Sequence, residues 1–173
     1  MKKIIMILST SFLMLGITII GCKKKETYVP TVNVSTYNTG VNGELRKISF
    51  VNSNLGFITN SKGKILKTTN QGLTWNVTVI DTTEQIDFYT LSTPSSQVIY
   101  ALGKDIFSNT FLYKSVDGGS TYTLKIGGET NGMDFSDNNN GFKINLDGLY
   151  KTTNGANTWT NINGLLFSFS PFF

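Results

Sequence analysis

Histidine is absent from this chain, and cysteine and arginine occur once each, at Cys22 and Arg46. Without histidine the chain lacks the usual general base, the Ser-His catalytic triads and the commonest zinc ligand. A single cysteine offers at most one thiol nucleophile, so carboxylates are the main groups left for acid–base chemistry. Because these common catalytic groups are missing or nearly so, we expect no catalytic residue and no enzyme activity.

Positive charge is concentrated at the amino-terminal end of the chain. The sequence has 15 basic and 11 acidic residues and a pI of about 9.1, which taken alone suggests a nucleic-acid partner. From Thr27 onward, however, ten basic and ten acidic residues remain, and the basic ones are scattered singly. The remaining lysines precede Thr27, at Lys2, Lys3, Lys23, Lys24 and Lys25. Because the body is neutral, we expect no nucleic-acid partner.

An eight-residue pattern, Ser/Thr-x-Asp/Asn-x-Gly-x-Thr-Trp/Tyr, occurs three times; we call each copy an octet. The octets begin at residues 68, 115 and 152, that is 47 and 37 residues apart. This spacing matches a propeller blade and is too long for a leucine-rich repeat or a coiled coil. A structural role is expected for the octet residues Thr68, Asn70, Gly72, Thr74, Trp75, Ser115, Asp117, Gly119, Thr121, Tyr122, Thr152, Asn154, Ala156, Thr158 and Trp159.

The sequence around each octet predicts a unit of four short strands. In the first unit the expected strands are 48–51, 56–59 and 64–68, and a fourth opens at Trp75; residues 48–66 align with residues 133–151. Period-two alternation between Asn, Gly and Asp turns is typical of all-β proteins. Within the octet, Asp or Asn is expected to bind the backbone two residues on, and Gly to supply a positive φ. The aromatic residue would close the corner by burying about 150 to 250 Å².

The octets resemble Asp-box, or BNR, repeats, and the longer unit is similar to the Ycf48/Hcf136-like propeller family. The likeness spans about Leu45 to Trp159, with Asn70 and Asn154 in place of Asp, Ala156 in place of Gly, and Tyr122 in place of Trp. The resemblance implies an all-β fold, a partial β-propeller of about three four-stranded blades, with each box between the third and fourth strands and away from the active face. It also implies a non-catalytic module for protein interaction or assembly.

Asp boxes also occur in sialidases, so a carbohydrate-binding or glycosidase-related surface protein is the alternative. Sialidases of this superfamily hold the substrate carboxylate with three arginines, whereas this chain has Arg46 alone. Scattered lysines do not replace bidentate guanidinium pairing. Exposed aromatic residues on one face, with Tyr89, Tyr100 and Tyr113 as candidates, would favour sugar stacking.

The amino terminus resembles a bacterial lipoprotein signal peptide. A basic head precedes an apolar run over residues 4–20, and a cleavage motif, Ile19-Ile20-Gly21, stands directly before Cys22. We expect a signal peptide at 1–21, a lipidated tether at 22–43 with the lipid on Cys22, and a three-repeat domain at 44–173. The mature protein would then be anchored to a membrane of the bacterial cell envelope. The alternative is an uncleaved transmembrane helix, since 17 residues at about 1.5 Å each approach a core of about 30 Å.

Two other segments gave weaker signals. Residues 32–37 alternate and are a candidate strand that completes a blade. The stretch Asp134–Gly141 has oxygen ligands suited to Ca²⁺, but it aligns with an ordinary turn in the first unit and lacks the spacing of an EF-hand loop. We therefore expect a turn there, and neither a metal nor a cofactor.

Propellers usually close with about four to eight blades, whereas this chain has room for three. The Phe-rich residues 165–173 resemble the first strand of a further repeat. We therefore expect a truncated member of a longer family, and self-association of sectors into a closed ring is the alternative. The expected partners are a membrane and an unidentified protein.

Overall fold

The computed structural model describes residues 36, 38–125 and 128–163. The signal peptide, the cleavage motif, Cys22, residues 165–173 and most of the tether lie outside the described residues, as does the candidate strand at 32–37 apart from Thr36. In the part of the chain that is described, no helix is long and apolar enough to cross a membrane.

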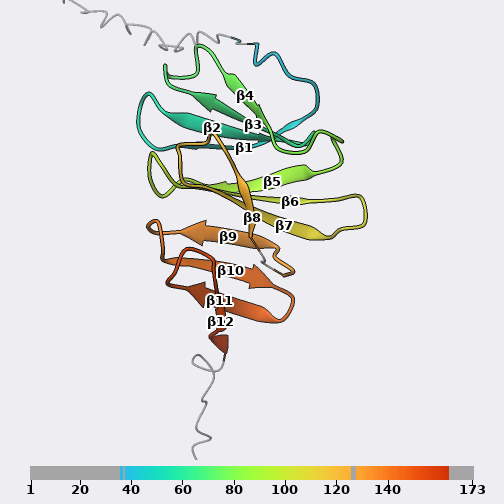
Figure 1. Ribbon diagram of the computed structural model, residues 1–173, viewed down its shortest axis with the longest axis vertical. Helices are drawn as coiled ribbons and strands as arrows, with labels where there is room; N and C mark the ends of the chain where they lie inside the picture. Colours follow the sequence, from blue (N-terminus) through green and yellow to red (C-terminus); the bar gives the residue numbers. More distant parts are fainter. Residues whose placement is uncertain (1–35, 37, 126–127, 164–173) are drawn as a thin grey trace, which may run out of the picture. The chain divides into compact units, whose positions relative to one another are not determined.

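Within the described ranges the chain forms three antiparallel four-stranded sheets, each a blade with its strands in chain order (Figure 1). This confirms the expected all-β, three-bladed partial propeller. Blade 1 contains β1 (Leu45–Phe50), β2 (Gly56–Asn60), β3 (Lys64–Thr68) and β4 (Asn76–Val79). Blade 2 contains β5 (Asp87–Ser92), β6 (Ile99–Lys104), β7 (Thr110–Ser115) and β8 (Thr123–Lys125). Blade 3 contains β9 (Gly132–Phe135), β10 (Gly141–Asn145), β11 (Gly148–Thr152) and β12 (Thr160–Asn161).

Every blade is a meander, so its loops lie at two opposite ends. The octets connect the third strand to the fourth, and their fourth residue donates its N–H to the turn between the first and second strands, as Gly118 N does to Gln97 O at 2.9 Å. We call this the octet end. The turns between the second and third strands lie at the other end with the links between blades, as in the bond from Gly63 N to Ile86 O at 2.8 Å. We call this the connection end.

The three octet turns share one hydrogen-bond network. In the second turn, the Ser115 hydroxyl donates to Asp117 Oδ1 at 2.8 Å and accepts the Gly119 N–H at 2.8 Å. Asp117 Oδ1 also accepts the Thr121 N–H at 2.9 Å, so the carboxylate reaches the backbone four residues on rather than the expected two. The Thr121 hydroxyl donates to Asp117 Oδ2 at 2.6 Å.

Asparagine fits the same network because its last bond reverses direction. Asn70 Nδ2 donates to Thr74 Oγ1 at 2.9 Å and Asn154 Nδ2 donates to Thr158 Oγ1 at 2.8 Å, where Asp117 accepts instead. The remaining bonds recur in both turns at 2.9 to 3.1 Å. The fifth residue has a positive φ in all three turns, at +87° for Gly72, +84° for Gly119 and +67° for Ala156.

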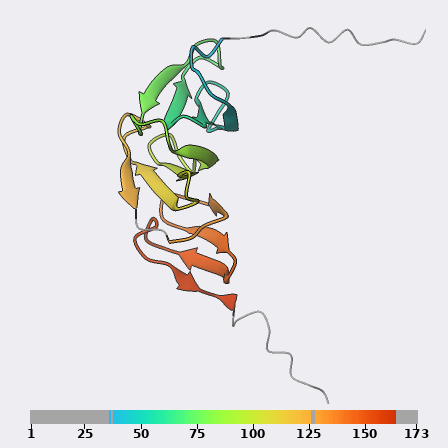
Figure 2. The ribbon, with the colours of Figure 1, turned by 90° about the vertical axis from the view of Figure 1, so that its right-hand side faces the viewer.

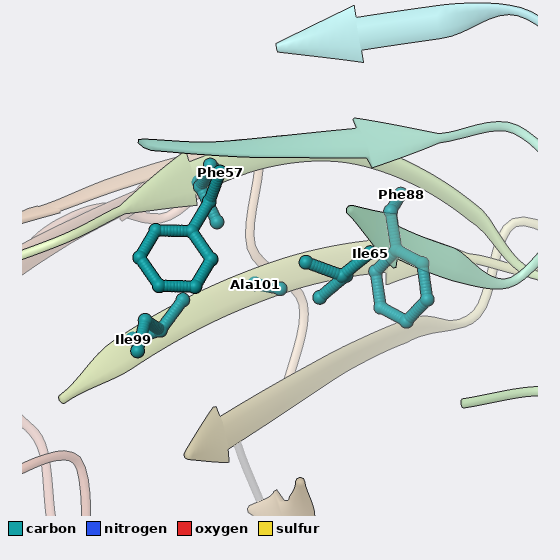
Figure 3. Close-up of a cluster of buried hydrophobic side chains, with 6 residues drawn as sticks. Phe57, Ile65, Phe88, Ile99 and Ala101 are labelled. Atoms are coloured by element: carbon teal, nitrogen blue, oxygen red, sulfur yellow. The ribbon is translucent and has the colours of Figure 1, made fainter. Parts of the chain in front are cut away.

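Apolar cores lie between consecutive blades. One joins Phe57 and Ile65 of blade 1 to the blade 2 residues Phe88, Leu91, Ile99 and Ala101 (Figure 3). The second joins Tyr100, Leu102 and neighbouring residues of blade 2 to Phe135 and Ala156 of blade 3, with Tyr100 and Phe135 stacked 3.6 Å apart. Both views of the ribbon show the sheets succeeding one another in chain order (Figure 2). Blade 2 is thus covered by an apolar core on both of its faces.

The three octet aromatic residues differ in whether they pack against a core between blades. Tyr122 packs against the first core and Trp159 against the second, where it meets Phe135 edge to face at 6.0 Å. Phe135 belongs to the same blade as Trp159, and Trp75 packs in the equivalent way on Phe50 of its own blade, edge to face at 6.4 Å. The difference is that Tyr122 and Trp159 also pack against the cores between blades, whereas Trp75 belongs to neither core.

Candidate functional site

A groove opens at the connection end between blades 1 and 2, with a volume of about 640 Å³. We call it the connection groove. Its walls come from β1, from the β2–β3 turn, from the link between β4 and β5, and from the β6–β7 turn. Its lining residues are Arg46, Ser61, Lys62, Thr83, Glu84, Gln85, Asp87, Lys104, Asp105 and Ile106. Three bases face three carboxylates here, so the groove is polar without a net charge.

Arg46, the only arginine of the chain, is held by two carboxylates. Its Nε and Nη2 donate to both oxygens of Asp87, at 2.9 and 2.8 Å, and its Nη1 lies 2.6 Å from Glu44 Oε2. The hydrogen bonds that Arg46 donates to Asp87, together with the negative charges of Asp87 and Glu44, raise the pKa of Arg46. This pairing joins blade 1 to blade 2 and occupies the guanidinium group that a substrate carboxylate would need.

Asp81 fixes the link between the two blades. Its Oδ1 accepts the N–H of Thr83 at 2.9 Å, and its Oδ2 accepts the N–H groups of Gln85 at 2.8 Å and Ile86 at 2.9 Å. Burial disfavours the charged carboxylate, but these bonds and one from the Thr83 hydroxyl outweigh it and lower the pKa of Asp81. The loop that forms one wall of the groove is therefore held in one conformation.

The β6–β7 turn presents two large apolar side chains to solvent. Ile106 is 72% exposed and Phe107 is 78% exposed. Asp105 Oδ1 accepts the N–H groups of Phe107 and Asn109, each at 2.9 Å, and its Oδ2 accepts Asn109 Nδ2 at 2.8 Å. The Asn109 side-chain bond is the main reason for the lowered pKa of Asp105. The exposed pair thus stands on a braced turn at the rim of the groove.

Each carboxylate of the groove has a structural partner. Asp105 braces its turn, Asp87 pairs with Arg46, and Glu84 Oε1 lies 2.6 Å from Lys64 Nζ. Among the described residues no group of three or more His, Cys, Asp or Glu side chains could hold a metal ion. A braced polar wall beside exposed apolar side chains is instead an arrangement suited to recognising a polypeptide.

The tyrosines considered for sugar stacking lie between blades. Tyr100 is fully buried and donates its hydroxyl to Asn138 O at 2.8 Å, and burial raises its pKa to about 12. Tyr89 is half-buried and donates to Thr130 O, while Tyr113 packs edge to face on Phe88 at 5.5 Å. None of the three forms an exposed aromatic platform.

The other predicted positions lie away from the groove. The octet residues gather at the opposite, octet end, as three separate turns. The stretch from Asp134 to Gly141 contains the β9–β10 turn, in which Asp137 Oδ1 accepts the N–H groups of Asn139 and Asn140 at 2.8 and 2.9 Å. The connection groove was not predicted from the sequence. A turn signal was present, however, because Asp105 and Asn109 lie on either side of Ile106 and Phe107.

The chain matches no protein-family model and no curated protein. Among solved structures it is similar to "YCF48 bound to D1 peptide", with a TM-score of 0.61 and 15% identity over 76% of this chain and 44% of that one. It is also similar to YCF48 from Cyanidioschyzon merolae, with a TM-score of 0.60 and 21% identity over 71% of this chain and 41% of that one. The chain spans about two-fifths of the length of these structures, and the likeness shows a shared β-propeller fold.

Proposed function

We propose that the protein is a membrane-anchored, non-catalytic β-propeller module of the bacterial cell envelope that binds another protein at the connection end. The observation that carries this proposal is the braced turn presenting Ile106 and Phe107 at the rim of the connection groove. Exposed large apolar residues mark interaction surfaces, and aromatic residues are enriched in them. A turn already held in place loses little conformational entropy on binding.

The fold comparison supports a polypeptide as the ligand. One YCF48 structure of the same fold was solved with a bound D1 peptide. The polar groove and the exposed pair suit a peptide, since the groove offers hydrogen-bond partners to main-chain groups while Ile106 and Phe107 contact an apolar side chain.

Binding is best tested with the purified full chain on a display library of random-sequence peptides and, in parallel, on a glycan array. We expect peptide binding that weakens about tenfold or more in Ile106→Ser and Phe107→Ser, since buried aromatic and aliphatic anchors dominate interface energy. Val116→Ser is the matched control, because Val116 is 66% exposed but lies in an octet turn. Glycan binding whose affinity is unchanged by these substitutions would favour the carbohydrate-binding alternative.

The anchor is tested separately on the amino-terminal residues. We expect bacteria that express the chain to incorporate labelled palmitate into it, and Cys22→Ser to abolish the label, because the thiol carries the diacylglycerol. The mature chain should begin at Cys22 by mass spectrometry. An unlabelled protein that retains residues 1–21 would favour the transmembrane-helix alternative.

A further inference from the structure

Each blade has one face directed toward the next blade along the chain, which we call its forward face. The strand register identifies equivalent residues, because Phe57 pairs with Lys67, Tyr100 with Lys114 and Phe142 with Lys151. In every case the lysine ammonium lies over the aromatic ring, at 6.0, 5.1 and 6.0 Å from its centre. The forward faces of the three blades are therefore built alike.

In blades 1 and 2 this face is covered by the octet turn of the following blade. Lys67 Nζ donates to Gly118 O at 2.7 Å, and Lys114 Nζ donates to Gly155 O at 3.2 Å. Both acceptors are the fourth octet residue. The rings of Phe57 and Tyr100 are completely buried. One lysine, one carbonyl and one ring thus recur in both joints between consecutive blades, beside the apolar cores.

In blade 3 the same face is open. Phe142 is 42% exposed, although its equivalents Phe57 and Tyr100 are fully buried. Ile144 is 51% exposed, whereas the residues at its position, Thr59 in blade 1 and Leu102 in blade 2, are at most 1% exposed. A shallow hollow of about 250 Å³ lies beside Phe142 and Ile144. The side-chain ammonium of Lys151 makes no hydrogen bond or ion pair with any residue that the structure describes.

Blade 1 presents the counterpart on its opposite, backward face. Ile48 is 53% exposed, whereas Leu91 at the same register position of blade 2 is 5% exposed. Phe50 is 44% exposed, whereas Phe135 at the same position of blade 3 is 5% exposed. The fourth octet residue of blade 1 is Gln71, whose N–H is bound to Asn54 O at 3.1 Å, as Gly118 and Gly155 are bound in their blades.

We propose that the forward face of blade 3 is a docking site for the backward face of blade 1 in a second copy of this chain. Lys151 then donates to the Gln71 carbonyl of the other copy, and Phe142 is covered by its octet turn. A second copy is the fitting occupant because one chain carries both halves of a joint that it already forms twice internally. The two halves differ, so the contact is head to tail, and two copies of three blades could close a six-bladed ring.

Cross-linking tests the pairing directly. Two full-length chains are made with Cys22→Ser, which removes the only native thiol, and carry either Lys151→Cys or Gln71→Cys. With a short bis-maleimide, the mixture should give a two-chain product, while each variant alone should remain a single chain. Cross-linking of the Lys151→Cys chain to itself would show a face-to-face contact and overturn the proposal. A mixture that stays uncross-linked would overturn it as well.

Light scattering of the full chain in detergent gives a second measurement. We expect a protein mass of two or more chains, falling to one chain in Phe142→Asp, because a carboxylate would be buried at the joint. Val116→Asp places the same charge on a more exposed apolar residue away from both faces, since Val116 is 66% exposed, and should keep the assembly. Unchanged thermal unfolding of both variants excludes misfolding as the cause. A single-chain mass for the unsubstituted protein would contradict the proposal.

Discussion

Replacing glycine by alanine at the fifth octet position should destabilise the second turn more than the first. Gly72 and Gly119 have nearly equal φ values, +87° and +84°, so each substitution incurs the same left-handed backbone cost of about 1–2 kcal/mol. The surroundings differ. A methyl group at Gly72 would meet Trp75 Cζ2 at an ordinary 3.4 Å, whereas one at Gly119 would lie 2.8 Å from Phe57 Cε1 and 3.1 Å from the Tyr122 hydroxyl.

The overlap at Gly119 adds about 1–3 kcal/mol, the usual cost of overpacking. We therefore expect Gly72→Ala to lower the free energy of unfolding by about 1–2 kcal/mol and Gly119→Ala to lower it by about 2–5 kcal/mol. Urea denaturation followed by far-ultraviolet circular dichroism measures both without relying on Trp75 fluorescence. Equal losses would refute the reasoning, because they would mean that the second turn does not pack on Phe57.

Three further outcomes follow from individual side chains. The hydrogen bonds from Thr121 lower the pKa of Asp117 to about 2, so its contribution is present above about pH 4 and lost as the pH falls toward 2; Asp117→Asn should flatten acid denaturation in this range, and an unchanged profile would contradict this. The Tyr122 hydroxyl is buried without a hydrogen-bond partner among the described residues, so Tyr122→Phe should raise the free energy of unfolding by about 1 kcal/mol in urea, whereas a loss would reveal a partner. Asp81→Ala should accelerate amide exchange at Thr83, Gln85 and Ile86, while Asp137→Ala, the control, should leave these amides protected.

The repeat made the fold predictable because its key interactions are local. The network of each octet lies within eight residues, from Ser115 to Tyr122 in the second copy, so a short pattern is enough to indicate the turn. The expected strands at 56–59 and 64–68 agree closely with β2 and β3, whereas β1 begins three residues earlier than expected, at Leu45. Strand ends depend on pairing with neighbours, which alternation alone does not specify.

The candidate site was not predictable in the same way because its parts are distant in sequence. Arg46 and Asp87 are 41 residues apart and meet only when two blades pack together. Likewise, alternation could not place Tyr100, because both faces of an inner blade are buried and period two separates only one face from the other. Sequence patterns indicate turns and strands here, but not the surfaces that the packing of blades creates.

The bond between Lys67 and the Gly118 carbonyl takes its acceptor from the main chain of the receiving turn, at a position where a side chain would touch the lysine, since a Cβ at Gly118 would lie 3.4 Å from Lys67 Nζ. The same octet position is glycine in both receiving turns, Gly118 and Gly155, and is Gln71 in blade 1. A duplicated inner repeat would therefore bring both the acceptor and the most space for the lysine of the preceding blade. In evolutionary terms, an inner repeat is a better template for adding a blade than the first repeat is.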